Sequence, residues 1–215
     1  MKTRIKICCI SSVEEAALAV SCGASALGLV SAMPSGPGVI DEDRIAEIIL
    51  TVPPAIGTFL LTAKQEADAI IDQQLRCRPN TMQLVDHVPE AELKKLRRAL
   101  PGISLVQVIH VTGEESIDEA RAAAPYVDAI LLDSGNQKLA VKELGGTGRV
   151  HDWSISRRIR ETCGRPLFLA GGLKPDNVRA AIDQVQPFGL DLCSGVRSDG
   201  HLDEMKLRAF FAAAQ

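Results

Sequence analysis

The stretch PLFLAGGLKPDNVRAAIDQV, residues 166–185, shows most clearly which fold the sequence predicts. It begins with a short apolar run typical of a buried strand and continues through the glycine-containing segment AGGL. After this segment, apolar residues recur at the spacing of one helix face: Val178, Ala181, Ile182 and Val185. Pro175 suits the first position of that helix. The stretch therefore predicts one unit of strand, loop and helix.

The same alternation recurs along the whole chain of 215 residues, 46% of which are apolar. A second helix is predicted after Ser12, because Glu15 follows it at capping-box spacing. Eight runs of β type start near Arg4, Ala26, Ala55, Thr81, Ile103, Asp128, Pro166 and Gly189. Their spacing of about twenty to thirty residues fits a strand, a helix and two loops. Residues 1–215 are therefore predicted to form a single-domain (βα)8 TIM barrel, with an open doubly wound sheet as the alternative.

Composition excludes several classes of function. The net charge of -3 comes from 24 basic and 27 acidic residues without a basic block, so we expect no nucleic-acid partner. The sequence has no apolar window long enough for a membrane helix and no apolar start typical of a secretory signal. The six cysteines form no CxxC pair, which favours reduced thiols over a metal site. We therefore expect a cytoplasmic protein without a membrane partner or a bound metal.

In either α/β fold, functional residues follow the carboxyl ends of the strands. The segment KICCI, residues 6–10, ends the first run with Cys8 and Cys9. If Ile5 and Ile7 face the helices, strand alternation turns Lys6 and Cys8 into the barrel and turns Cys9 outward or into the loop. A lysine close to Cys8 would favour its thiolate, although a free cysteine is more often a small buried core residue.

Two further strand ends and the loop before the predicted helix at residues 153–162 are rich in glycine. The candidate residues are Gly145, Gly146, Gly148, Gly171, Gly172, Ser194 and Gly195. Such segments can direct backbone N–H groups at a phosphate dianion, and loops after the last two strands commonly do so in these barrels. The alternative for each is an ordinary turn. Asp133 ends the run DAILL and is the candidate acid, with a loop-capping carboxylate as the alternative.

Together these motifs resemble the phosphoribosylanthranilate isomerase family of tryptophan biosynthesis over most of the chain. The family's KICG corresponds to KICC at residues 6–9, and its GGTG with DW corresponds to residues 145–148 with Asp152 and Trp153. Its AGGL.P.NV is found at residues 170–178, and its D.SSGVE corresponds to DLCSGVR at residues 191–197.

The resemblance implies an Amadori rearrangement of an aminoaldose to an aminoketose without a cofactor. It implies that Cys8 is the general base, that Asp133 is the general acid and that Asp191 lies close to a small phosphosugar substrate. It also implies phosphate binding by Gly146, Gly148, Gly172 and Gly195. A homo-oligomer is compatible with the sequence.

The chain also departs from the family pattern. SGPGV at residues 35–39 stands where the family has SPR.V, whose arginine meets the anthranilate carboxylate, and Arg197 stands where the family has glutamate. QLVD at residues 83–86 replaces QLHG. Arg44, Arg149 and Arg197 are candidates for a substitute cation. The favoured hypothesis is the isomerase itself; the alternatives are a paralogue that isomerises another phosphosugar and a non-catalytic barrel that binds a phosphorylated metabolite.

Overall fold

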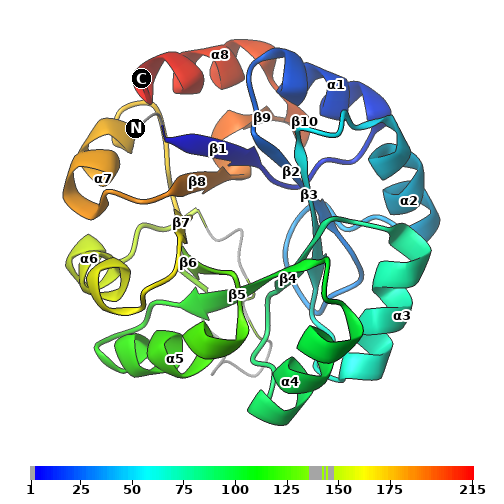
Figure 1. Cartoon of the computed structure of the whole chain (residues 1–215). Coiled ribbons are helices and arrows are strands. Elements are labelled where there is room, and N and C mark those ends of the chain that lie inside the picture. The colour runs from blue at the N-terminus through cyan, green and yellow to red at the C-terminus, as the bar shows by residue number, and fades with distance from the viewer. Residues whose placement is uncertain (1–2, 136–141, 143, 145–147) are drawn as a thin grey trace.

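Eight parallel strands close into a barrel inside a ring of helices (Figure 1). This computed structural model describes residues 3–135, 142, 144 and 148–215. The barrel strands are β1 (Arg4–Ile7), β2 (Ala26–Val30), β3 (Gly57–Thr62), β4 (Thr81–Leu84), β5 (Ser104–His110), β6 (Ala129–Asp133), β7 (Leu167–Leu169) and β8 (Gly189–Leu192). Because β1 pairs with both β2 and β8, the sheet has no free edge. The predicted TIM barrel is confirmed, and the open doubly wound sheet is excluded.

A helix follows each barrel strand and covers the outside of the sheet (Figure 1). These helices are α1 (Val13–Ser21), α2 (Glu42–Thr51), α3 (Ala67–Cys77), α4 (Glu90–Ala99), α5 (Glu115–Ala123), α6 (Trp153–Thr162), α7 (Val178–Val185) and α8 (Glu204–Ala213). Short elements complete the described chain: the 3-10 turns η1 (Ala124–Tyr126) and η2 (Ser194–Val196), and the hairpin strands β9 (Arg197–Ser198) and β10 (His201–Leu202). None of the helices in this part of the chain has the length and apolar character that a membrane crossing requires.

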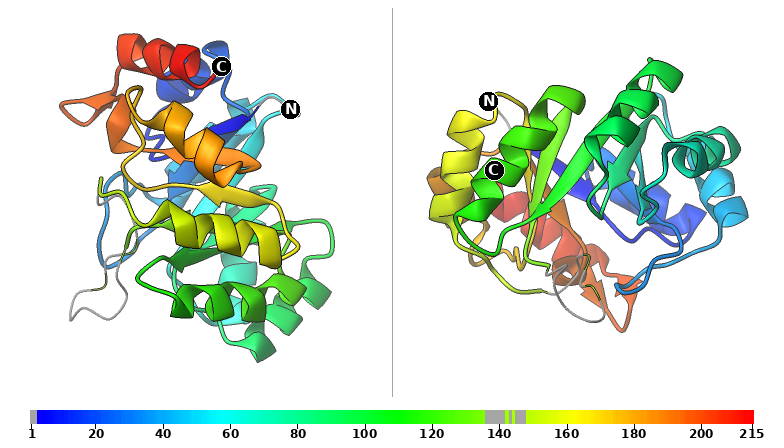
Figure 2. Two further views of the ribbon diagram at one scale, coloured as in Figure 1. Left: turned by 90° about the vertical axis from the view of Figure 1, so that its left-hand side faces the viewer. Right: turned by 90° about the horizontal axis from the view of Figure 1, so that it is seen from below.

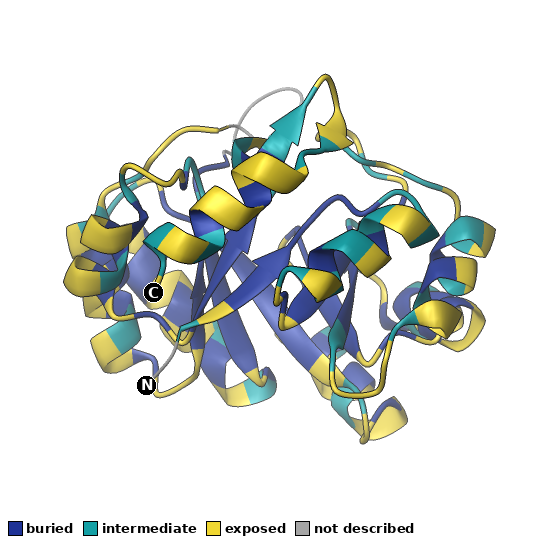
Figure 3. Ribbon diagram, turned by 90° about the horizontal axis from the view of Figure 1, so that it is seen from above, coloured by how far each residue is buried: buried dark blue, intermediate teal, exposed yellow. Residues whose placement is uncertain are grey.

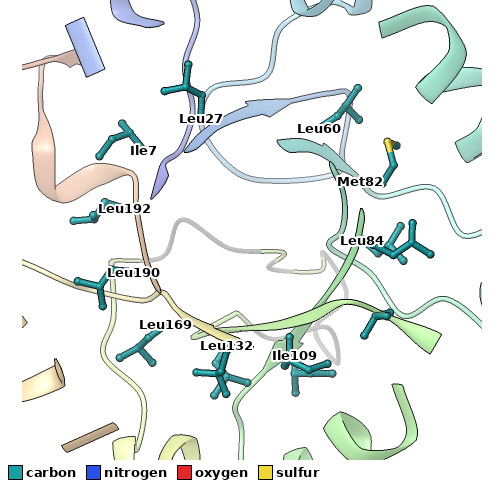
Figure 4. Close-up of a cluster of buried hydrophobic side chains, with 14 of the residues drawn as sticks. Ile7, Leu27, Leu60, Met82, Leu84, Ile109, Leu132, Leu169, Leu190 and Leu192 are labelled. Atoms are coloured by element: carbon teal, nitrogen blue, oxygen red, sulfur yellow. The ribbon is translucent and has the colours of Figure 1, made fainter. Parts of the chain in front are cut away.

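The main hydrophobic core lies between the strands and the helices. Figure 4 shows side chains such as Leu60, Leu132 and Leu190 pointing away from the barrel axis. Figure 3 shows the consequence: the strands are buried, and each helix exposes only its outer face. Ile5 and Ile7 belong to this outer core, whereas Cys8 packs with the residues inside the barrel. The alternation predicted for the first strand is therefore confirmed as far as Cys8.

A column of three aromatic rings runs from the barrel interior to its amino end. The rings of Phe59 and Phe168 meet edge to face with centroids 5.7 Å apart, and Phe168 meets Phe188 in the same way at 5.5 Å. The guanidinium of Arg4 lies 4.2 Å from the centroid of the Phe188 ring, and the ammonium of Lys6 lies 5.3 Å from that of Phe59. Edge-to-face packing of this kind stabilises a core beyond the burial of area alone.

Two predicted helix starts differ in detail from the structure. Ser12 caps α1 by accepting from Glu15 N at 3.1 Å, but the Glu15 carboxylate accepts from Ser11 N instead of returning to Ser12. The helix predicted from Pro175 begins only at Val178. The reason is the Asn177 side chain, which accepts from Lys174 N and donates to the Gly172 carbonyl, closing a turn before the helix.

The loops after the strands gather at one end of the barrel. Figure 2 shows the segment after β2, the β9–β10 hairpin and the segment before α6 at this end. The candidate residues from the first, sixth, seventh and eighth strands therefore share one rim.

Candidate active site

A cavity opens at the carboxyl end of the barrel. It is lined by most of the residues predicted for the site: Cys8, Asp133, Gly148, Gly171, Gly172, Asp191, Ser194 and Gly195. Gly146 and Gly145 lie outside the described residues. The fold thus brings together residues 8 to 195 of the chain around one space.

Cys8 lies beside a buried ion pair. Nζ of Lys6 donates to Oδ1 of Asp191 at 2.8 Å, and the Lys6 side chain has no exposed surface. A Cβ on Gly28 would stand 2.8 Å from both the Lys6 ammonium and the Cys8 sulfur, so both groups flank this glycine of β2. The glycine leaves room for the thiol and the ammonium to approach each other.

This environment favours the ionised form of Cys8. The neighbouring Cys9 thiol, as a hydrogen-bond donor, lowers the pKa of Cys8, and the positive charge of Lys6 lowers it further. Together these effects outweigh burial, which raises it. Burial in turn lowers the pKa of Lys6, but the charges of Asp191 and Cys8 more than offset this and raise it above its ordinary value. Lys6 therefore stays charged beside the thiol.

The prediction that Cys9 turns away from the site is wrong. Cys9 lines the same cavity as Cys8, with its Sγ 3.6 Å from the Pro37 carbonyl oxygen. Strand β1 ends at Ile7 and Cys9 has a φ of 63°, so the alternation of the strand no longer sets its direction. Hydrogen bonding with Cys193 and Cys8 raises the pKa of Cys9. Cys9 therefore stays protonated, and its S–H group can donate a hydrogen bond to either the Pro37 carbonyl oxygen or the Cys8 sulfur.

Asp133 lies on the wall formed by β6. It is the last residue of β6 and is half-buried, and its Oδ1 accepts from Ser134 N at 2.7 Å. The strand end thus presents a carboxyl group to the cavity that Cys8 also lines.

The glycine loops bring the backbone close to the cavity. Gly172 has a φ of 61°, and a Cβ there would lie 2.8 Å from the Arg149 carbonyl carbon; a Cβ on Gly195 would lie 2.5 Å from the Leu173 oxygen. Neither position admits a side chain. Within the described chain the N–H groups of Gly171 and Gly172 have no acceptor. Two adjacent free donors on a positive-φ turn can hold an anion.

The three arginines considered as a substitute cation do not line this cavity. Arg44 lies on the outer surface of α2, paired with Glu47 at 2.6 Å. Arg197 is turned inward against Glu15. Arg149 follows Gly148 and is exposed. The described lining contains no lysine or arginine at all.

Lys142 is a cation that the sequence reasoning missed. Its carbonyl accepts from the Ser35 hydroxyl in the altered second-strand loop, and its ammonium pairs with Asp86 at 2.5 Å. Asp86 belongs to QLVD, the other segment that departs from the family pattern. The two altered segments thus meet at one lysine, which no local motif could have revealed.

The comparison with known proteins agrees with this geometry. The family model for N-(5'-phosphoribosyl)anthranilate (PRA) isomerase matches residues 5–213. The chain belongs to the phosphoribosylanthranilate isomerase family. Similar relatives in this family include isomerase 2 of Methanosarcina mazei, 38% identical over 99% of this chain and 94% of the relative. The isomerase of Haloferax volcanii is 36% identical over 99% and 93%.

Solved structures of phosphoribosylanthranilate isomerases share the fold. The enzyme from Thermotoga maritima superposes with a TM-score of 0.84 at 30% identity, covering 99% of this chain and 98% of that chain. A phosphoribosylanthranilate isomerase in complex with reduced 1-(o-carboxyphenylamino)-1-deoxyribulose 5-phosphate has a TM-score of 0.82 at 29% identity and the same coverage.

Proposed function

We propose that this phosphoribosylanthranilate isomerase uses Cys8 as general base and Asp133 as general acid. The overall reaction is that of the family: an intramolecular oxidoreductase of tryptophan biosynthesis converts the aminoaldose N-(5-phosphoribosyl)anthranilate into the carboxyphenylamino-deoxyribulose phosphate. The observation that carries the assignment is a thiol favoured as thiolate in the same cavity as a half-buried carboxyl group. Acid and base catalysis needs this combination.

The first step opens the sugar ring. Protonated Asp133 donates its proton to the furanose ring oxygen, and the bond between that oxygen and C1 breaks. The lone pair of the anthranilate nitrogen forms the C=N bond of a Schiff base. The backbone donor Ser134 N then stabilises the carboxylate that Asp133 has become.

The second step moves the carbon-bound proton. The Cys8 thiolate removes the proton from C2, and the electrons of that bond form the C1=C2 double bond of an enolamine. Tautomerisation then oxidises C2 to the ketone while C1 gains a proton and is reduced. The reaction is internally balanced and needs no external oxidant. The charge of Lys6 compensates the anion on Cys8 before proton transfer.

The phosphate fixes the sugar between these groups. In this proposal Gly148, Gly171, Gly172, Asp191, Ser194 and Gly195 surround the substrate, with the backbone N–H groups of the glycines on the phosphate. Such anchoring converts remote binding energy into correct placement of C2 and the ring oxygen.

The aglycone end would meet an apolar wall. Val30, Met33 and Leu144 line the cavity there, which suits the aromatic ring of anthranilate. We propose that Lys142 binds the anthranilate carboxylate and gives up its ion pair with Asp86 when it does so. Lys142→Met should raise KM by about tenfold or more with a small effect on kcat, whereas Arg44→Met should leave both unchanged.

The decisive test is loss of phosphoribosylanthranilate fluorescence on addition of the purified enzyme. Cys8→Ser should abolish nearly all turnover, because a hydroxyl is a far poorer base than an assisted thiol. Turnover by Cys8→Ser within threefold of the parent would reject Cys8 as the base. A parent without turnover but with phosphate binding would favour the paralogue or the non-catalytic binder.

We also propose a cytoplasmic enzyme, because all six cysteines are free thiols, which suits a reducing compartment. One similar structure is described as monomers of dimeric phosphoribosylanthranilate isomerase from Thermotoga maritima. A homo-oligomer of this chain is testable by light scattering.

A further inference from the structure

Arg197 and Glu15 link two loops of the site through buried contacts, and this pair of residues is called the bracket below. Nη1 of Arg197 lies 2.8 Å from Oε1 of Glu15, and only 9% and 11% of the two side chains are exposed. Its Nη2 donates to the carbonyl oxygens of Cys8 at 3.3 Å and Cys9 at 2.5 Å. The planar guanidinium thus contacts a carboxylate and two successive backbone carbonyls at once.

Glu15 extends the bracket in two further directions. Its carboxylate accepts from Ser11 N at 3.0 Å and from Leu202 N at 2.8 Å. Ser11 belongs to the loop after β1, and Leu202 belongs to β10 of the hairpin. Arg197 itself also donates to the Gly200 carbonyl at the hairpin turn. One ion pair therefore joins the loop after β1 to the hairpin after β8.

The two joined segments carry different parts of the proposed chemistry. On the first loop, the contacts of Arg197 fall on the carbonyl groups of Cys8 itself and of the next residue, Cys9. Ser194 and Gly195 belong to η2, which leads directly into Arg197 on the other side. The strands beneath are already paired, since Cys8 N donates to Leu192 O at 2.7 Å. Above this bond, Arg197 and Glu15 add a charged side-chain connection to the hydrogen bond between the Cys9 and Cys193 thiols.

We propose that Arg197 is a positioning residue that holds Cys8 in register with the phosphate-binding turn at Ser194 and Gly195. The inference rests on the proposed roles of Cys8 and of that turn. Arg197 does not touch the substrate in this proposal. It fixes the distance between the base and the phosphate-binding turn, which must match the span of the bound sugar from C2 to the 5-phosphate.

The backbone of Cys9 explains why such a bracket is needed. Cys9 has a φ of 63° without being glycine, a conformation that costs an L residue free energy and persists only when its surroundings hold it. Arg197 binds the carbonyl of this same residue. Without the guanidinium, Cys9 is free to return to an ordinary conformation, and Cys8 would move with it.

The test compares two double variants that each remove both charges of one ion pair. Arg197→Met with Glu15→Gln removes the bracket without leaving a buried charge. Arg208→Met with Glu204→Gln removes an exposed pair on α8 and is the matched control. Arg197→Lys tests whether a positive charge alone restores the function. Measurements are kcat and KM for phosphoribosylanthranilate, competitive inhibition by inorganic phosphate, and protection of Cys8 from iodoacetamide by ribose 5-phosphate.

We expect the bracket variant to lose tenfold or more in kcat while inhibition by inorganic phosphate stays within twofold of the parent. Ribose 5-phosphate, which spans both ends, should protect Cys8 at least fivefold less well. The control pair should match the parent, and Arg197→Lys should recover part of kcat. Should the bracket variant fail to fold, Glu15→Gln alone weakens the same connection and should shift the same readouts.

A purely structural role would lower the thermal midpoint but leave kcat and protection unchanged below it, and that result would overturn the proposal. Parallel loss of inorganic phosphate binding would overturn it as well. If the parent enzyme does not turn over phosphoribosylanthranilate, the proposed function fails, yet the protection measurement still decides the role of Arg197.

Discussion

Lys6 and Asp191 form an ion pair inside the barrel at 2.8 Å, and the Cys8 thiol flanks the same glycine, Gly28, as the positive partner. Charged groups rarely occupy a barrel interior without a reason, because removing them from water costs several kcal/mol per ion. Here the pair supplies a fixed positive charge to a thiol that must ionise.

Replacing Lys6 by Met should remove that charge at nearly constant volume. The pKa of Cys8 should rise, so that alkylation by iodoacetamide requires a higher pH, and turnover at neutral pH should fall about tenfold or more. Because Asp191 is left buried without its partner, the free energy of unfolding should fall by about 3–5 kcal/mol. The double variant with Asp191→Asn should recover stability but not thiol reactivity; equal reactivity of Lys6→Met and the parent would contradict this role.

Replacing Cys9 by Gly should preserve the fold but make Cys8 harder to ionise. The φ of 63° suits glycine, so the variant should fold, but the donor that lowers the pKa of Cys8 is lost. We expect the rate of Cys8 alkylation to shift to higher pH, and kcat at neutral pH to fall several-fold and recover in more alkaline buffer. Cys22→Ser at the end of α1 is the control. An unshifted pH profile of alkylation would mean that the Cys9 thiol donates its hydrogen bond only to the Pro37 carbonyl and not to Cys8.

Replacing Asp133 by Asn should remove the proton donor while keeping its shape. The amide can no longer protonate the ring oxygen, and loss of a general acid costs about a hundredfold or more in turnover. Inhibition by inorganic phosphate should stay as in the parent, and Asp118→Asn on the surface of α5 should have no effect. Turnover within threefold of the parent would exclude Asp133 from the mechanism.

Replacing Gly172 by Ala should damage phosphate binding. The added Cβ would stand 2.8 Å from the Arg149 carbonyl carbon and 2.9 Å from the Gly148 oxygen, so the turn must move. We expect KM and the inhibition constant of inorganic phosphate to rise together, with a smaller effect on kcat. At Gly102 a Cβ meets nothing within 4 Å, and Gly102→Ala is the matched control. Unchanged phosphate inhibition would reduce the glycine loops to ordinary turns.

The Glu15 carboxylate should make stability depend on pH in acid. Burial raises the pKa of Glu15. Hydrogen bonds from Arg197 and from the N–H groups of Leu202 and Ser11 lower it by more than burial raises it, so the pKa lies below the ordinary 4.5. A carboxylate whose pKa is lower in the folded than in the unfolded state stabilises the fold at any pH above its unfolded-state pKa. This stability is lost as the pH falls through the folded-state pKa. Urea titrations of the parent should therefore show a steeper decline below pH 4.5 than those of Glu15→Gln. Glu90→Gln, on an exposed pair, should decline much as the parent does.

Local patterns were sufficient to predict the barrel. Each barrel strand begins at the predicted residue or at most two residues later, because apolar periodicity and turn residues are encoded in short segments. The same holds for Cys8 and Asp133, which the ends of apolar runs identify. Pro175 marks the limit: the Asn177 side chain forms a turn that postpones the helix to Val178.

Contacts between distant segments could not be predicted in this way. Cys9 enters the cavity because its backbone leaves the strand conformation, and Arg197 finds Glu15 across 182 residues of sequence. Arg197, a candidate for the substitute cation, pairs with Glu15 and does not line the cavity for the same reason. Its nearest partner is set by how two loops meet, which no single segment encodes.

The aromatic column of Phe59, Phe168 and Phe188 has a consequence for how protons travel. Phe59 lies below the Lys6 ammonium and packs edge to face against Phe168, so aromatic rings stand between the Cys8 thiol and the amino end of the barrel. A substrate held at the mouth would then cover the remaining exit. A hydron taken from C2 would therefore be shielded from exchange with bulk water until product departs, so that part of an isotopic label would return to the sugar carbon from which it came.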